Sequence, residues 1–202
     1  MRRGHGDETL TVEREATPSF AAAGSGYFGV WRDAGAGNAI SGVALSASSS
    51  PLGAVISVAG ANASDVRPLV ASNGSMYVAF WNEEERLLAR GFGAAGTPTT
   101  NTITVAERGN LESAVYDGRT FLVFHSVTDQ SGRPAVVMQR LTPSLQLLSG
   151  AVTLDIRNVL AAASGGPGRT AIGYQRFDWT LGRRIITAPN AGPLPPLTCA
   201  GP

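Results

Sequence analysis

The chain has little of what usually cross-links or anchors a protein. Its 202 residues contain one cysteine, Cys199, so no internal disulfide can form. No stretch approaches the about 18 to 20 uninterrupted apolar residues of a membrane span, which predicts no membrane insertion. Hydrophobic residues make up 43% of the chain, enough for a sizeable core. The fold of this sequence must therefore be held by apolar packing rather than by covalent links.

An excess of charge of either sign is lacking as well. Sixteen basic residues, all of them arginine, stand against fifteen acidic ones, for a formal net charge of +1. This balance does not supply the basic stripe that neutralises the phosphates of a nucleic acid, so we expect no nucleic-acid partner. His5, His125 and Cys199 do not have the spacing of zinc ligands, and no calcium-binding loop is present. We expect neither a metal nor a cofactor.

What the chain does have is internal repetition. Four apolar runs align, and their last positions are 50, 44 and 50 residues apart. The runs are Tyr27–Trp31, Tyr77–Trp81, Phe121–His125 and Ala171–Gln175. A period of this length is typical of propellers and solenoids, in which one small unit is copied along the chain.

Each copy divides into short strand-like runs with turn residues between them. Asn73-Gly74 and Asp117-Gly118 separate the first two runs of their copies. Such dipeptides favour the type I′ turn of a β-hairpin, because both of its central residues need a positive φ. Four short strands per unit, repeated radially, make a β-propeller blade. We therefore predict an all-β protein, a β-propeller of about four four-stranded antiparallel blades.

The predicted division of the chain follows the copies. A disordered N-terminus covers residues 1–7, and a Pro/Gly-rich tail covers 189–202. The propeller repeats occupy 8–188, with units at 18–66, 67–110, 111–157 and 158–188.

The two ends of the repeat array complement each other. The fourth unit lacks a fourth run, whereas residues 8–15 contain a spare one, Thr9–Glu13, which matches Thr102–Ala106 in type. This spare strand either completes the last blade, and so closes a four-bladed ring, or is the remnant of a preceding blade. Closure would remove exposed sheet edges. An open fragment of a larger ring and a ring completed by a second chain are the alternatives.

One segment favours a helix when it is taken alone. Asn82–Arg90 begins with an N-capping asparagine and an acidic first turn. The aligned copies hold Gly, Ser and Pro at this place, and a repeat outweighs local propensity. We therefore predict strands here.

The order of these features resembles a known pattern. A first run, a Gly turn, Tyr-x-x-x-Trp, a polar loop that often contains Asp, and a third strand are similar to the β-propeller repeats of large secreted or surface proteins of myxobacteria and other GC-rich bacteria. The resemblance covers about residues 8–188 and implies a propeller at the cell surface or outside the cell, although the first residues of the chain contain no apolar core of a signal peptide. His125 and Gln175 depart from the pattern, because they stand where Trp is expected.

Two sets of residues are candidates for ligand binding. The first is the set of equivalent positions Trp31, Trp81, His125 and Gln175, whose side chains either stack on sugars or pack neighbouring blades together, burying about 150 to 250 Å² for each large aromatic. The second is the polar end of the second runs, on one rim of the propeller, because loops on a rigid scaffold commonly bind ligands. These rim residues are Arg32, Asp33, Asn82, Glu83, Arg176 and Asp178.

No catalytic constellation is apparent, and we predict no catalytic residue. His125, Ser126 and Asp129 are the side-chain types of a nucleophile system, but a triad is defined by geometry and not by adjacency in the sequence.

We therefore predict a non-catalytic binding or scaffold module that uses its rim loops or a central channel. The predicted ligand is a glycan or a protein, and the module is a monomer or part of a larger propeller. One alternative is a carbohydrate-active enzyme whose acid and base come from Asp33, Glu83 or Asp178, with carboxyl groups about 5 to 9.5 Å apart. Another is a structural segment of a larger surface protein.

Overall fold

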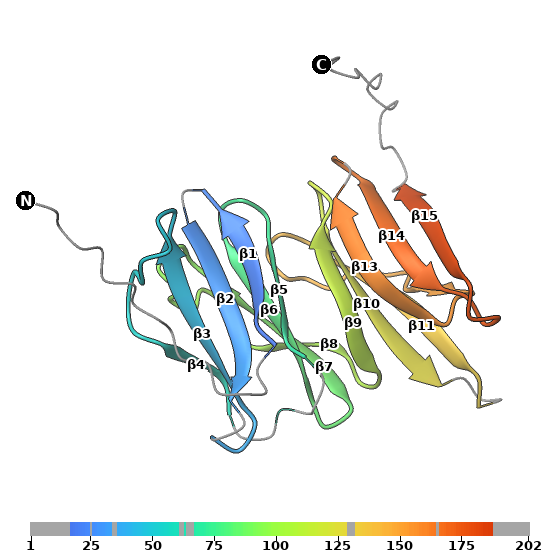
Figure 1. Cartoon of the computed structure of the whole chain (residues 1–202), viewed down its shortest axis with the longest axis horizontal. Coiled ribbons are helices and arrows are strands. Elements are labelled where there is room, and N and C mark those ends of the chain that lie inside the picture. Colours follow the sequence, from blue (N-terminus) through green and yellow to red (C-terminus); the bar gives the residue numbers. More distant parts are fainter. Residues whose placement is uncertain are drawn as a thin grey trace, which may run out of the picture.

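The computed structural model describes residues 17–24, 26–33, 36–60, 63, 67–128, 132–164 and 166–187. In this part of the chain every regular element is a β-strand, and no helix is long and apolar enough to cross a membrane. The strands form four antiparallel sheets, each made of strands that are consecutive in the sequence. The sheets follow one another in chain order (Figure 1), and we call them blades 1 to 4.

Three blades have four described strands, and the last has three. Blade 1 consists of β1 (Ser19–Ala23), β2 (Gly26–Asp33), β3 (Ala39–Ser46) and β4 (Ile56–Ala59). Blade 2 consists of β5 (Leu69–Ser72), β6 (Tyr77–Glu83), β7 (Arg86–Phe92) and β8 (Ile103–Ala106). Blade 3 consists of β9 (Asn110–Tyr116), β10 (Phe121–Thr128), β11 (Pro134–Leu141) and β12 (Val152–Leu154). Blade 4 consists of β13 (Asn158–Ser164), β14 (Arg169–Gln175) and β15 (Leu181–Thr187).

The prediction of an all-β fold with about four antiparallel blades is confirmed. The spare strand at residues 8–15 lies outside the described residues. Blades 1 and 4 lie at opposite ends of the row in Figure 1, with blades 2 and 3 between them. We call this succession of described blades, with blades 1 and 4 at its ends, the arc.

The hairpins between first and second strands form as predicted, but with a different turn. Only the glycines have a positive φ, at 89° for Gly74 and 88° for Gly118. In each turn the preceding side chain accepts hydrogen bonds from two backbone N–H groups: Asn73 from Ser75 and Met76, and Asp117 from Arg119 and Thr120. A side chain that bonds the backbone two and three residues on stabilises such a turn without a second positive φ.

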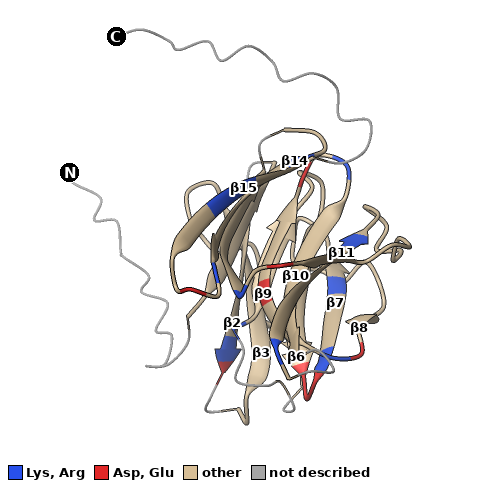
Figure 2. Cartoon of the chain, turned by 90° about the vertical axis from the view of Figure 1, so that its right-hand side faces the viewer, with Lys and Arg blue, Asp and Glu red and all other residues tan. Residues whose placement is uncertain are grey.

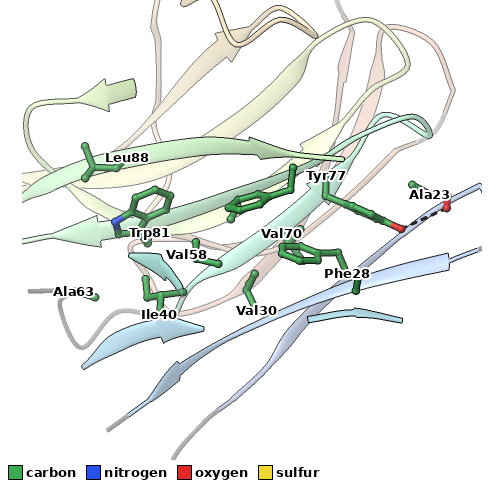
Figure 3. Packing of buried hydrophobic residues seen from close by; sticks show 13 residues of the cluster. Ala23, Phe28, Val30, Ile40, Val58, Ala63, Val70, Tyr77, Trp81 and Leu88 are labelled. Carbon is green, nitrogen blue, oxygen red and sulfur yellow. Dashed lines mark hydrogen bonds between the residues drawn. The ribbon is translucent and has the colours of Figure 1, made fainter. Parts of the chain in front are cut away.

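The hydrophobic core lies between the blades, in three clusters. Between blades 1 and 2 the ring of Phe28 stacks on those of Tyr77 and Phe92, with centroids 5.4 and 5.1 Å apart. Trp81 completes this cluster (Figure 3). The second cluster joins blades 2 and 3, and the third joins blades 3 and 4. Apolar packing between neighbouring blades therefore holds the arc together.

Successive residues of a second strand serve opposite interfaces. On β6, Tyr77, Ala79 and Trp81 belong to the cluster shared with blade 1, whereas Val78 and Phe80 belong to the cluster shared with blade 3. This follows from the two-residue period of a strand, which turns alternate side chains to opposite faces. A blade inside the arc must therefore be apolar on both faces.

The alignment of the fourth copy is wrong by one residue. Tyr174, and not Gln175, occupies the place of Trp81 and His125, because Tyr174 and Ile172 pack in the cluster with blade 3. The strand pairing agrees with blade 3, since Val159 is opposite Tyr174 and the equivalent Leu111 is opposite His125. A shift of one residue exchanges the faces of a strand, so the buried face determines which register is correct.

The segment from Asn82 to Arg90 forms strands and no helix. It contains the end of β6, a turn and the start of β7. Glu84 adopts a positive φ of 56° in that turn. The repeat therefore outweighs the helical propensity of the three consecutive glutamates, as predicted.

Replacing Trp81 tests whether the space between blades is a true core. The side chain is 2% exposed. We expect Trp81→Ala to lower the free energy of unfolding by about 3 to 5 kcal/mol, since it removes a large buried ring. The control Trp179→Ala removes an exposed indole that lies under the guanidinium of Arg157, and about 1 kcal/mol is expected there. Equal losses in urea titrations of the two variants would contradict a core between the blades.

Candidate functional site

The candidate site is the rim at which second strands end and third strands begin. The topology brings the loops β2–β3, β6–β7, β10–β11 and β14–β15 to this rim, together with the segments that lead into the first strands. Acidic and basic residues gather along the chain around the turn between β6 and β7 (Figure 2). All six predicted rim residues lie in these loops or at the strand ends that lead into them.

On blade 1 the predicted rim residues make local contacts. A terminal nitrogen of the Arg32 guanidinium donates to the side-chain oxygen of Asn38 at 3.4 Å. The Asp33 carboxylate accepts the backbone N–H of Ala36 at 3.2 Å. Both residues are half-buried. These contacts stabilise the conformation of the β2–β3 loop.

Asn82 joins two blades. It is buried, its amide nitrogen donates to the carbonyl of Gly109 at 2.6 Å, and its side-chain oxygen accepts the N–H of Leu111 at 2.8 Å. Because both polar ends of the amide are satisfied within the protein, the prediction that Asn82 binds a ligand is replaced by a structural role.

The other junctions contain a related hydrogen bond. The Ser19 hydroxyl accepts the N–H of Val70 at 3.1 Å, and the Glu112 carboxylate accepts the N–H of Val159. In all three cases the donor is the second residue of the first strand of the next blade. Sequence reasoning missed these contacts, because the acceptors are of three different residue types at positions that do not align.

The four residues that were aligned in the sequence, Trp31, Trp81, His125 and Gln175, do not form a ring of stacking surfaces. Trp81 and His125 are 2% and 3% exposed, and their side chains fill the spaces between blades. Trp31 and Gln175 are half-buried. Burial leaves Trp81 and His125 no ring face for a sugar, so at these two positions the interpretation as packing residues is correct.

The three carboxylates proposed for an enzyme lie on three different blades and have separate partners. Glu83 pairs with Arg86 at 3.2 Å. Asp178 accepts the hydroxyl of Thr180 at 2.6 Å, and this hydrogen bond lowers the pKa of the Asp178 carboxyl. Asp33 makes the loop contact described above. This arrangement does not pair two of these carboxyl groups as the acid and base of a glycoside hydrolase.

His125 and Ser126 lie on opposite faces of β10. His125 faces blade 2. Ser126 faces blade 4, because its hydroxyl is hydrogen-bonded to the Glu112 carboxylate, and that carboxylate also accepts the N–H of Val159 in blade 4. Adjacent residues of a strand cannot share a catalytic contact in this way. Asp129, the third predicted member of the set, lies outside the described residues.

A groove opens on the rim between blades 2 and 3. It has a volume of about 410 Å³ and is walled by residues of both blades and of the segment that connects them. The residues whose polar groups or charges line it are Glu85, Arg108, Gly109, Asn110, Ser126 and Thr128. Glu85 and Arg108, which both line it, lie 3.8 Å apart, and both side chains are largely exposed. A pair this exposed contributes little to stability, so both charges are free to engage a ligand.

Burial changes the ionisation of two groups near the groove. It lowers the pKa of the His125 imidazole, whose ring nitrogens have no hydrogen-bond partner among the described residues. It raises the pKa of the Glu112 carboxyl, although the hydrogen bonds from Val159 and Ser126 oppose this. In both cases the neutral form is favoured because a charge loses its hydration.

Comparisons with known proteins bear on the fold. No protein-family model and no curated protein matches the sequence. Among solved structures, the subtype N10 neuraminidase-like protein of A/little yellow-shouldered bat/Guatemala/060/2010 is similar, with a TM-score of 0.54 and 9% identity over 86% of this chain and 59% of that one. The β-propeller domain of the Trilobed protease from Pyrococcus furiosus is similar with a TM-score of 0.54 and 13% identity, over 85% of this chain and 54% of that one. The fold is a β-propeller.

A third similar structure is that of U3-55K, with a TM-score of 0.54 and 14% identity over 91% of this chain and 53% of that one. The chain thus spans just over half the length of each of these structures. Propellers serve many unrelated functions, so the fold does not identify a ligand. Among the described residues, no group of three His, Cys, Asp or Glu side chains could hold a metal ion.

The junction between blades 2 and 3 can be tested at Asn82. In Asn82→Ala the N–H of Leu111 and the carbonyl of Gly109 lose their partner, and a buried polar group without one costs about 1 to 3 kcal/mol. We expect a loss of that size in urea unfolding. The control Asn101→Ala, in an exposed loop, should change stability by less than about 0.5 kcal/mol. Equal stabilities of the two variants would contradict a structural role for Asn82.

The buried imidazole predicts a dependence of stability on pH. Because burial lowers the pKa of His125 in the folded state, the unfolded chain takes up a proton first as the pH falls through about 6.5, and stability falls with it. Glu112 acts in the opposite sense, since its raised pKa makes stability fall as the pH rises above about 4.5.

We therefore expect His125→Phe, measured in a Glu112→Gln background, to reduce the loss of stability between pH 7 and pH 5. The measurement is the urea midpoint at each pH. An aromatic ring suits this place, because the equivalent residue of blade 2 is Trp81. An unchanged slope would show that His125 is not the group that titrates.

Proposed function

We propose that this propeller is a non-catalytic protein-binding module, and that it holds a polypeptide segment in the groove between blades 2 and 3. The observation that carries the proposal is the groove itself, a hollow of about 410 Å³ on the loop rim that is lined in part by the exposed Glu85–Arg108 pair. Loops on a rigid scaffold are where binding residues concentrate.

The lining of the groove favours a polypeptide over a glycan. Sugars are held by stacking on exposed aromatic rings, and no described residue that lines the groove is aromatic. Instead the groove offers backbone groups of Gly109 and Asn110, two hydroxyl groups and one charge of each sign. A protein loop can match such a mixed polar surface with its own backbone and charged side chains.

Two further observations support this function. The walls of the groove are joined by the hydrogen bonds of Asn82, so the ligand meets a surface that is already in place. The resemblance of the repeats to those of secreted and surface proteins favours a partner outside the cell. The separate positions of Asp33, Glu83 and Asp178 favour binding over glycoside hydrolysis.

A charge reversal tests the proposal. Peptides enriched from a random displayed library on the folded protein would be measured by fluorescence anisotropy against wild type, Arg108→Glu and Arg119→Glu. Arg119 is a matched control, because it is exposed in the β9–β10 turn, at the opposite end of β10 from the groove. We expect Arg108→Glu to weaken binding at least about tenfold, equivalent to about 1.4 kcal/mol, and Arg119→Glu to leave it unchanged. Equal binding by the two variants, or selective binding to a glycan array, would overturn this function.

A further inference from the structure

The outward face of blade 1 has the pattern of a face that packs against another blade. Tyr27, Gly29 and Trp31 on β2 occupy the positions that Tyr77, Ala79 and Trp81 occupy on β6. The three residues of β6 are buried against blade 1. The three residues of β2 point the other way, because Phe28 and Val30 between them face blade 2.

Neighbouring strands extend this aromatic face. Phe20 on β1 is opposite Gly29, and its ring lies over that glycine so closely that a Cβ there would come within 2.4 Å of it. Phe20 is 54% exposed and Tyr27 is 40% exposed, whereas the equivalent Tyr77 is fully buried. Blade 1 lies at one end of the arc in Figure 1, and no other described blade covers this side of it. We call these side chains, Phe20, Tyr27 and Trp31, the aromatic end face.

The far side of blade 4 is its structural counterpart. Ile172 on β14 faces blade 3, so Ala171 and Gly173 face outward, in the positions from which Val78 and Phe80 of blade 2 reach the next blade. On β15, Leu181 and Ile185 are 71% and 62% exposed. We call this surface, Ala171, Gly173, Leu181 and Ile185, the small-residue end face.

The two end faces differ in the bulk of their side chains. Blade 4 carries a shallow hollow of about 440 Å³ lined by Ala171, Arg183 and Ile185 among others. Blade 1 carries bulky rings that could fill it. Arg183 is opposite Gly173 in the pairing of β14 and β15, where its guanidinium would meet the aromatic rings of the other face.

We propose that blade 4 of one copy packs on blade 1 of a second copy, and that blade 4 of the second copy packs on blade 1 of the first, so that two chains close a ring of eight blades. Each contact continues the face-to-face packing that joins blades 1 to 4 within the chain. Each chain spans 53% to 59% of the similar solved structures, so two chains together match somewhat more than the length of one of them. Two identical contacts related by a two-fold axis close the assembly.

Sedimentation velocity between about 1 and 100 μM tests this ring. The expected mass of the wild type is twice the chain mass of 20.8 kDa. Phe20→Glu places a charge in the aromatic end face and Ile185→Glu places one in the small-residue end face, so each variant alters both contacts of the dimer. Each variant should raise the dissociation constant of the dimer at least about tenfold. Both positions are exposed within the chain, so circular dichroism and the urea midpoint should show intact folding. The matched control Leu147→Glu, 49% exposed on blade 3, should leave the dimer intact.

Mixing the two variants distinguishes this arrangement from any other dimer. The Phe20→Glu chain keeps a normal blade 4, and the Ile185→Glu chain keeps a normal blade 1, so a mixture can form one intact contact. Association in the mixture, when each variant alone is monomeric, would support head-to-tail packing. A wild type that stays monomeric at 100 μM, a dimer that only one of the two variants disrupts, or a ladder of larger oligomers would each overturn the closed ring.

Discussion

The structure depends on one constraint, which is that the second strand of every blade inside the arc must bury both of its faces. Tyr77 and Trp81 serve one interface and Phe80 the next, so a single strand belongs to two hydrophobic clusters. No separate core is needed, because the hydrophobic clusters form between neighbouring blades. Burial of this kind is the main favourable contribution to folding in a chain with no disulfide in its repeats.

The sequence was sufficient to predict the four blades, but it was insufficient to align the second strand of the fourth blade with those of the others. Turn dipeptides and recurring aromatic runs are local signals, and they predicted the sheets and the hairpins. The fourth copy was misaligned because Ala171–Gln175 contains only two large apolar side chains, Ile172 and Tyr174, so no second aromatic fixed the register. Only contact with blade 3 shows that Tyr174 is the residue equivalent to Trp81.

The sequence predicted where the rim residues lie, but it did not predict what Asn82 does there. Strand ends place Arg32, Asp33 and Glu83 on one rim, and this follows from topology alone. The role of Asn82 depends on Gly109 and Leu111, which are 27 and 29 residues away in the next blade. A blade junction needs only a side-chain acceptor that reaches one backbone N–H, and the side chains of Ser, Asn and Glu can all accept that hydrogen bond. The repeat therefore contains no sequence signal that identifies the accepting residue.

The same rule of two buried faces has a consequence at the ends of any arc. An end blade either loses its large side chains on the outer face or exposes them to water, where they favour association. Blade 4 has Ala171 and Gly173 in its outer face, whereas blade 1 keeps the full aromatic set around Trp31. The two ends are therefore unlike, and a contact between them is directional: an aromatic face meets a small-residue face. Two aromatic faces brought together would crowd their rings, and two small-residue faces would leave a gap and bring two Arg183 side chains into proximity. This asymmetry is what favours head-to-tail association over a symmetrical contact between like ends.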